Sequence, residues 1–289
     1  MRPSLKRGLH VVGGALGMLG IVFVGMRLHS YSAEIDFARF HAGDWLFLGF
    51  LALLYGADNL LLAQAWRQLL SYFDVQIESA PAIRIYGLSQ LAKYVPGNIF
   101  HLAGRQALGM ASGIPSGPLA KSMLWELGLI AFSGALFSLL VTPLLWRKLP
   151  VWLSIGMFGV LLFVVLILAR RLLSASVRTA LLEQVGFLFV SGVIFLALLK
   201  FISSADIPTS LFPAICGAYV IAWLIGFVTP GAPAGVGIRE LVLLFLMKSM
   251  VLEADLLLAV VLGRAVTVLG DLSYFLSTAA IRTIPGERG

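Results

Sequence analysis

The stretch that decides the fold of this chain is residues 87–109, GLSQLAKYVPGNIFHLAGRQALG. Its composition is that of a membrane helix, but Pro96-Gly97 interrupts it near the middle, because proline lacks a backbone N–H and disrupts a helix. In the second half Asn98, His101 and Arg105 follow at spacings i, i+3 and i+7, which places them on one face of a short helix. The stretch therefore predicts a broken membrane helix with a polar face.

A second stretch, residues 226–241 (GFVTPGAPAGVGIREL), is interrupted in the same way at Pro230-Gly231. In each stretch an arginine lies nine residues after the proline of the break, Arg105 in the first and Arg239 in the second. A polar residue follows each arginine, and in the second stretch it is Glu240. We interpret the two stretches as corresponding parts of one site.

The composition places the chain in a membrane. Of 289 residues 60% are hydrophobic and 12% charged, and the mean hydropathy is +0.97, so most of the chain is expected to face lipid. The net charge of +7 comes from bases that flank apolar runs, where they set topology and contact anionic headgroups; no nucleic-acid partner is expected. The lone Cys216 excludes an intramolecular disulfide and a multi-cysteine metal site, and no metal or cofactor is expected.

The chain contains six apolar runs that we expect to cross the membrane as helices. They are residues 8–28, 45–70, 118–146, 151–169, 184–202 and 255–280. A cleaved signal peptide is the alternative for the first run, but the run is longer than the roughly 7 to 15 apolar residues of such a peptide. We therefore interpret it as a membrane helix.

The first broken segment is too short on either side of its break to span. About 14 residues precede Pro96 and about 14 follow it, which at 1.5 Å per residue cannot cross a core of about 30 Å. A re-entrant hairpin that begins and ends on one side of the membrane is expected for each segment.

The order of these elements predicts an inverted repeat. A shift of 134 positions superimposes the two Pro-Gly breaks and brings 8–28 near 151–169 and 45–70 near 184–202. The expected fold is an all-α integral membrane protein, a single domain over 1–289 with halves 1–146 and 150–289. Each half has about three spanning helices and one re-entrant hairpin, an arrangement that points to a transporter's binding site. In this arrangement more Lys and Arg residues lie on the side of the membrane that carries both termini than on the other side. Both termini are therefore expected in the cytoplasm.

Charged residues remain inside the predicted spans and hairpins. The cations are Lys93, Arg105, Arg239 and Arg264, and the anions are Asp58, Glu126, Glu240 and Asp271. Each costs about 2.5 to 3.5 kcal/mol at a helix centre, so we expect pairing or a wet cavity. Either a ligand site or ion pairs that only hold the fold would account for them. Arg239 is expected to pair with Asp271 or Glu240, and a stripe on the last span is expected to face the cavity: Arg264, Thr267, Asp271, Tyr274 and Thr278.

Two stretches, SQLAKYVPGNIFHLAGRQ and TPGAPAGVGIRE, resemble the signature stretches of the transmembrane domain of bacterial lysylphosphatidylglycerol synthases and its stand-alone flippase-like relatives. The resemblance covers essentially the whole chain and implies an inner-membrane lipid-translocase-like fold with re-entrant helices. No soluble aminoacyl-transferase domain follows Gly289, so synthase activity is not expected, and VTPGAPAGVG is richer in Ala and Pro than the family pattern. The resemblance implies headgroup-site roles for Lys93, Pro96, Gly97, Arg105, Pro230, Gly231, Arg239 and Glu240.

Three functions are therefore weighed for this chain. The first is a multi-pass translocase of the bacterial inner membrane for an anionic phospholipid or a polyprenyl-phosphate-linked lipid. The second is a non-catalytic accessory subunit of a lipid-modifying or glycan-assembly enzyme, and a homo-oligomer is a further possible assembly. The third is an integral-membrane transferase with Glu126, Glu240 or Asp271 as base, although no nucleophile and base are in register and an enzyme is not expected. The full set of expected substrate-binding residues is Lys93, Pro96, Gly97, Asn98, His101, Arg105, Pro230, Gly231, Arg239, Glu240, Arg264 and Asp271.

Overall fold

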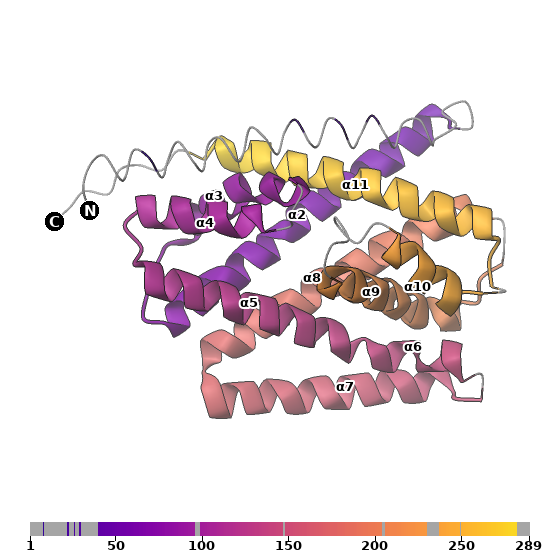
Figure 1. Ribbon diagram of the computed structural model, residues 1–289. Helices are drawn as coiled ribbons and strands as arrows, with labels where there is room; N and C mark the ends of the chain where they lie inside the picture. Colours follow the sequence, from indigo (N-terminus) through magenta and orange to yellow (C-terminus); the bar gives the residue numbers. More distant parts are fainter. Residues whose placement is uncertain are drawn as a thin grey trace.

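The computed structural model describes residues 40–95, 99–146, 148–203, 206–229, 237–248 and 250–281, and single positions 8, 22, 26 and 29. Every regular element in these residues is a helix (Figure 1). The predicted span over 8–28 falls almost wholly outside the described residues. So do the break residues Pro96, Gly97, Asn98, Pro230 and Gly231.

The helices of the first half are α2 (Ala42–Tyr72), α3 (Ser79–Gln90), the 3₁₀ turn η2 (Leu91–Tyr94), α4 (Phe100–Ala111), α5 (Ser116–Leu136) and α6 (Ser138–Leu145). Those of the second half are α7 (Val151–Leu168), the π-helical turn η3 (Ala169–Leu173), α8 (Ala175–Ile202), the 3₁₀ turn η4 (Thr209–Leu211), α9 (Phe212–Val228), α10 (Ile238–Leu246) and α11 (Glu253–Ala279).

Within the described residues, six helical segments are long and apolar enough to cross a membrane. They are Ala42–Tyr72, Ser116–Leu145, Val151–Leu173, Ala175–Ile202, Thr209–Val228 and Glu253–Ala279. This number and composition of helices make the chain an all-helical, multi-pass membrane protein. Five of the six segments overlap spans that the sequence predicts. The sixth, η4 with α9, precedes the second break and is not among the predicted spans.

The start of α8 differs from the prediction for a local reason. The apolar run begins near residue 184, whereas the helix begins at Ala175, capped by Ser174, whose Oγ accepts a hydrogen bond from the N–H of Val177 at 3.1 Å. Polar residues such as Arg178 and Glu183 occupy the first turns. Hydropathy therefore detects only the later part of a helix whose start is fixed by its cap.

Proline is accommodated inside α6 by a neighbouring hydroxyl. Pro143 has no N–H to donate to the carbonyl of Leu139, one turn earlier. The hydroxyl of Thr142 donates to that carbonyl at 2.7 Å instead. The predicted span over 118–146 therefore continues through α5 and α6.

Helices α2, α8 and α11 pack against one another at the centre of the molecule. The side chains of Trp66, Leu69 and Leu70 on α2 are completely buried. The axes of α2 and α11 approach closely at Gly56 and Gly270, where a Cβ on Gly270 would stand 2.6 Å from the carbonyl oxygen of Ala52. In lipid the hydrophobic effect does not drive helices together, so close packing at small residues such as these contributes to their association instead.

The short helices lie at opposite ends of this centre. Figure 1 draws α3 and α4 at the left, beside the end of α2 and the start of α5, and α9 and α10 towards the right. Helix α7 runs along the edge and packs on α5, α6 and α8; only Ser154 is buried in it. Its exposed apolar surface fits a lipid-facing position.

Candidate functional site

A cavity of about 160 Å³ lies between the two groups of short helices. Side chains from α2, α3, η2, α4, α5, α8, α9, α10 and α11 line it. Its polar lining consists of Tyr55, Tyr86, Gln90, Lys93, Tyr94, His101, Arg105, Glu126, Ser191, Tyr219, Arg239, Arg264, Thr267 and Asp271. The apolar wall includes Leu62, Leu102, Leu127, Ile130, Phe187, Trp223, Phe227 and Val268. Ligand sites combine such an apolar wall with a few convergent polar groups.

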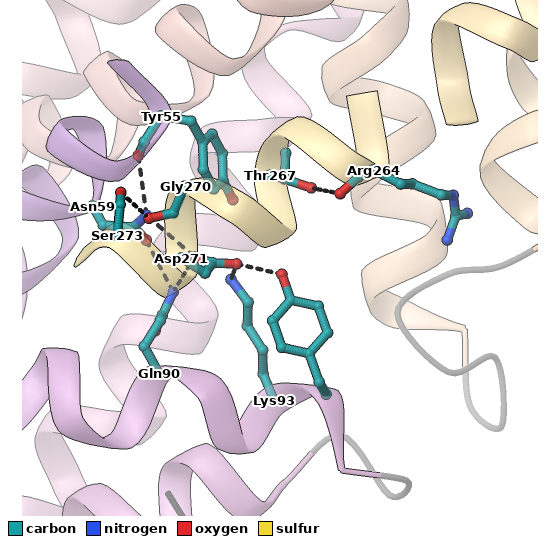
Figure 2. Close-up of polar contacts among 10 residues, drawn as sticks. Tyr55, Asn59, Gln90, Lys93, Arg264, Thr267, Gly270, Asp271 and Ser273 are labelled. Atoms are coloured by element: carbon teal, nitrogen blue, oxygen red, sulfur yellow. Dashed lines mark hydrogen bonds and ion pairs between the residues drawn. The ribbon is translucent and has the colours of Figure 1, made fainter. Parts of the chain in front are cut away.

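Asp271 on α11 is the centre of one polar cluster (Figure 2). Its side chain is completely buried, and Oδ2 lies 2.6 Å from Nζ of Lys93 and accepts a hydrogen bond from the hydroxyl of Tyr94 at 2.5 Å. Oδ1 accepts from Nδ2 of Asn59 at 3.2 Å and from Nε2 of Gln90 at 3.4 Å. This carboxylate thus ties α2, α3, η2 and α11 together, and its charge is compensated.

Arg105 on α4 belongs to a second, separate cluster. Its guanidinium forms an ion pair with the carboxylate of Glu126 on α5, and both side chains are buried. The guanidinium lies 3.8 Å from the ring centroid of Tyr86, and the hydroxyl of Tyr86 donates to Glu126 at 2.8 Å. The cation is therefore held by a carboxylate and a π face, and it is neutralised within the protein.

A third ion pair joins α10 to α11. Nη2 of Arg264 lies 2.7 Å from Oε1 of Glu240. Figure 2 shows Arg264 pointing away from the Asp271 cluster, although both residues belong to α11. The polar residues of this helix therefore serve two different clusters.

Arg239 on α10 lines the same cavity, but its charge is not paired. Among the described residues no carboxylate lies within ion-pair distance of it, and its buried Nε has no hydrogen-bond partner. The expected pairing of Arg239 with Asp271 or Glu240 is wrong, because Lys93 takes the first carboxylate and Arg264 takes the second. Arg239 is half-buried, and a charge that is partly withdrawn from water without a partner is costly unless a ligand or water compensates it.

The described cavity therefore carries one positive charge in excess. Three of the four cations expected in the interior pair with three of the four anions, and Arg239 and Asp58 take no part in these pairs. Asp58 is buried on α2 and does not line the cavity, and its Oδ2 has no hydrogen-bond partner. The balance beside the cavity is thus four cations against Glu126, Asp271 and Glu240.

Only the first part of the predicted polar stripe on the last span faces the cavity. Arg264, Thr267 and Asp271 line the cavity as expected. The expectation is wrong for Tyr274 and Thr278, which pack against α3: the hydroxyl of Tyr274 donates to the carbonyl of Ile83 at 3.5 Å, and Thr278 covers Gly87. The end of the stripe thus serves helix packing.

Two further polar groups of the cavity lack partners in the described residues. Nδ1 of His101 on α4 and Oγ of Ser191 on α8 are buried and accept or donate no hydrogen bond there. His101 and Arg105 lie on one face of α4 and both reach the cavity, as their spacing predicts.

Several lining residues escape the sequence analysis. Tyr86 and Gln90 precede the predicted Lys93 at seven and three positions in the first broken segment, a helical spacing that was available as a signal. Ser191 carries no such signal, because one serine in an apolar span is common. The rings of Trp223 and Phe227 on α9 stack with their centroids 5.1 Å apart. Nothing in the sequence distinguishes these two residues from other apolar residues of a membrane helix.

The described residues contain no group of three or more His, Cys, Asp or Glu that could hold a metal ion. Comparisons of the chain with protein-family models, with curated proteins and with solved structures found no match. The function is therefore argued from the cavity.

Proposed function

We propose that this chain is a lipid translocase of the bacterial inner membrane that moves a lipid with an anionic phosphate headgroup between leaflets. The observation that carries the proposal is the unpaired Arg239 in a cavity between membrane helices. Guanidinium groups match phosphate oxygens in a bidentate fork. The apolar part of the lining, including Trp223 and Phe227, would accommodate the start of the acyl or prenyl chains.

The proposal includes the inverted repeat, which helix order and packing support. Adding 134 to the residue numbers carries α2 onto 176–206, against Ala175–Ile202 for α8, and carries α5 with α6 onto 250–279, against Glu253–Ala279 for α11. The contacts correspond as well. The pairs α2–α3, α3–α4, α4–α5 and α2–α5 of the first half match α8–α9, α9–α10, α10–α11 and α8–α11 of the second.

The proposal also treats α3 with α4, and α9 with α10, as re-entrant pairs. Helices α3 and α4 have 12 residues each and α10 has 9, so they are about 18 and 14 Å long against a core of about 30 Å. The segment η4 with α9 is long enough to cross, so the re-entrant assignment of the second pair rests on the short α10 and on the corresponding contacts. Helices α3 and α4 pack against each other, as do α9 and α10. Both termini would then lie in the cytoplasm.

The ion pairs favour transport over a transferase. Glu126, Glu240 and Asp271, the carboxylates considered as a base, are each engaged by a cation. A general base must reach the proton that it abstracts, and each of these carboxylates is turned to a cation instead. No corresponding observation favours an accessory subunit.

The test is transport by the purified protein in liposomes. A phospholipid labelled on its acyl chain is followed as a membrane-impermeant reductant bleaches the outer leaflet. Arg239→Gln is expected to lower the initial rate about tenfold or more, since a charged hydrogen bond is lost. Arg171→Gln, on an exposed arginine of η3, is the matched control and should transport normally. A wild-type rate equal to that of protein-free liposomes would contradict the proposal and leave the accessory role.

A further inference from the structure

The cavity restricts more properties of its ligand than the sign of the charge. Its excess of one cation, its size and its unpaired polar groups each restrict the chemistry of a headgroup. We infer, on the basis of the proposed function, that the site takes a lipid phosphodiester that carries one negative charge and a small, uncharged, hydroxylated substituent, such as a polyol or a single sugar.

The charge follows from the ion pairs. Lys93 with Asp271, and Arg105 with Glu126, form two neutral pairs. The α10–α11 side holds two arginines against one glutamate, so Arg239 is the excess cation.

The undescribed loops at the breaks do not alter this balance. Residues 96–98 and 230–236 contain no charged side chain. One phosphodiester anion would bring the balance to zero. A second negative charge would be buried without a partner, at a large desolvation cost.

The size follows from the volume. The cavity of about 160 Å³ is smaller than the roughly 300 to 1,000 Å³ of sites for drug-sized ligands. An oligosaccharide or a second lipid phosphate with its own chains exceeds that space. A phosphate with one small substituent remains.

The hydroxyl groups follow from the unpaired atoms. Ser191 is 6% exposed, and its Oγ lines the cavity without a partner among the described residues. Nδ1 of His101, on α4, is also buried beside the cavity without a hydrogen-bond partner among the described residues. A buried hydroxyl or imidazole nitrogen without a hydrogen bond is destabilising, and a hydroxylated substituent can both donate and accept there.

Three lipids with identical labelled acyl chains separate these requirements. Phosphatidylglycerol has one negative charge and two hydroxyls, phosphatidylpropanol has the same charge and carbon number without the hydroxyls, and phosphatidylcholine is zwitterionic. Phosphatidylglycerol is expected to cross about threefold faster than phosphatidylpropanol or more, as one lost neutral hydrogen bond predicts. It is expected to cross about tenfold faster than phosphatidylcholine or more, because Arg239 then faces a neutral headgroup.

Two serine variants test whether the preference for phosphatidylglycerol arises in the cavity. Ser191→Ala should reduce the preference for phosphatidylglycerol over phosphatidylpropanol and leave the phosphatidylpropanol rate unchanged. Ser154→Ala removes another buried serine, on α7, whose Oγ donates to the carbonyl of Val151 outside the cavity, and should preserve the preference. The Ser191 change removes a single oxygen, so folding is expected to be intact.

Equal rates for phosphatidylglycerol and phosphatidylpropanol, or a preference unmoved by Ser191→Ala, would overturn the inference while transport itself stood. Efflux of entrapped glycerophosphoglycerol without lipid movement would show that the ligand is a soluble phosphodiester, and would overturn the lipid assignment. No movement of any lipid above protein-free liposomes would remove the proposed function and this inference together.

Discussion

At the scale of single residues, the two arginines that follow the Pro-Gly breaks have different environments. Arg105 is buried against Glu126 and Tyr86, whereas Arg239 faces the cavity without an ion pair in the described part of the chain. The sequence analysis treats them as equivalent because their spacing from the breaks is the same. Their difference depends on Glu126, which lies on another helix and can be assigned only from the fold.

We therefore predict that Arg105 acts mainly in stability. Removing one member of a buried pair leaves an uncompensated charge, so Arg105→Gln or Glu126→Gln is each expected to destabilise by about 3–5 kcal/mol. The double variant should lose less than the sum, with a coupling of about 0.5–3 kcal/mol. Unfolding in detergent measures all four proteins. Additive losses would show that the two side chains do not depend on each other.

Arg239 should show the opposite behaviour. Arg239→Gln removes a half-buried charge that has no ion-pair partner among the described residues, so the unfolding midpoint should stay at or above that of the wild type. The same detergent unfolding measures it, with Arg171→Gln as the control. A loss of stability as large as that of Arg105→Gln would make Arg239 a structural residue.

At the scale of helices, the approach of α2 to α11 depends on glycine. A Cβ on Gly270 would meet the carbonyl oxygen of Ala52 at 2.6 Å, while a Cβ on Gly159 of α7 would meet nothing within 4 Å. We expect Gly270→Ala to destabilise by about 1–3 kcal/mol through overpacking. Gly159→Ala should be neutral or stabilising by about 0.5–1 kcal/mol, since alanine favours a helix. Equal effects in an unfolding experiment would contradict the close contact.

The proposed hairpin gives a prediction about sidedness. Arg84 on α3 and Lys121 on α5 flank the α3–α4 pair, so both should lie on the cytoplasmic side. Single cysteines at these positions, in a Cys216→Ser background, should react with an impermeant thiol reagent from the same side of the membrane. Labelling from opposite sides would mean that α3 and α4 together cross the membrane.

Much of the helical order is predictable from hydropathy and the two breaks, because apolar length and proline act locally. Five long helices overlap the predicted spans, and differences at their ends have local causes, such as the Ser174 cap that starts α8 before its apolar run. The cavity is harder to predict. Asp271 takes its partners from α2, α3 and η2, up to 212 positions away in the sequence, and no spacing rule relates them.

At the scale of the whole molecule, corresponding helix pairs are joined by ion pairs of opposite order. The arginine lies on α4 and its glutamate on α5 in the first half, whereas the glutamate lies on α10 and its arginine on α11 in the second. The second half adds Arg239, which leaves the excess charge on that side of the cavity. In the proposed inverted repeat, two similar halves would thereby carry an asymmetric site, and the headgroup phosphate is expected on the α10 side.

The position of the phosphate is the most direct test of the central claim that Arg239 binds the lipid headgroup. A cryo-electron microscopy structure of the protein in nanodiscs of anionic phospholipid would locate it. The account predicts headgroup density in the cavity, with a phosphate oxygen within about 4 Å of the Arg239 guanidinium and the Arg105–Glu126 pair intact. A phosphate bound at Arg105 with Glu126 displaced, or a cavity that holds only water, would contradict it.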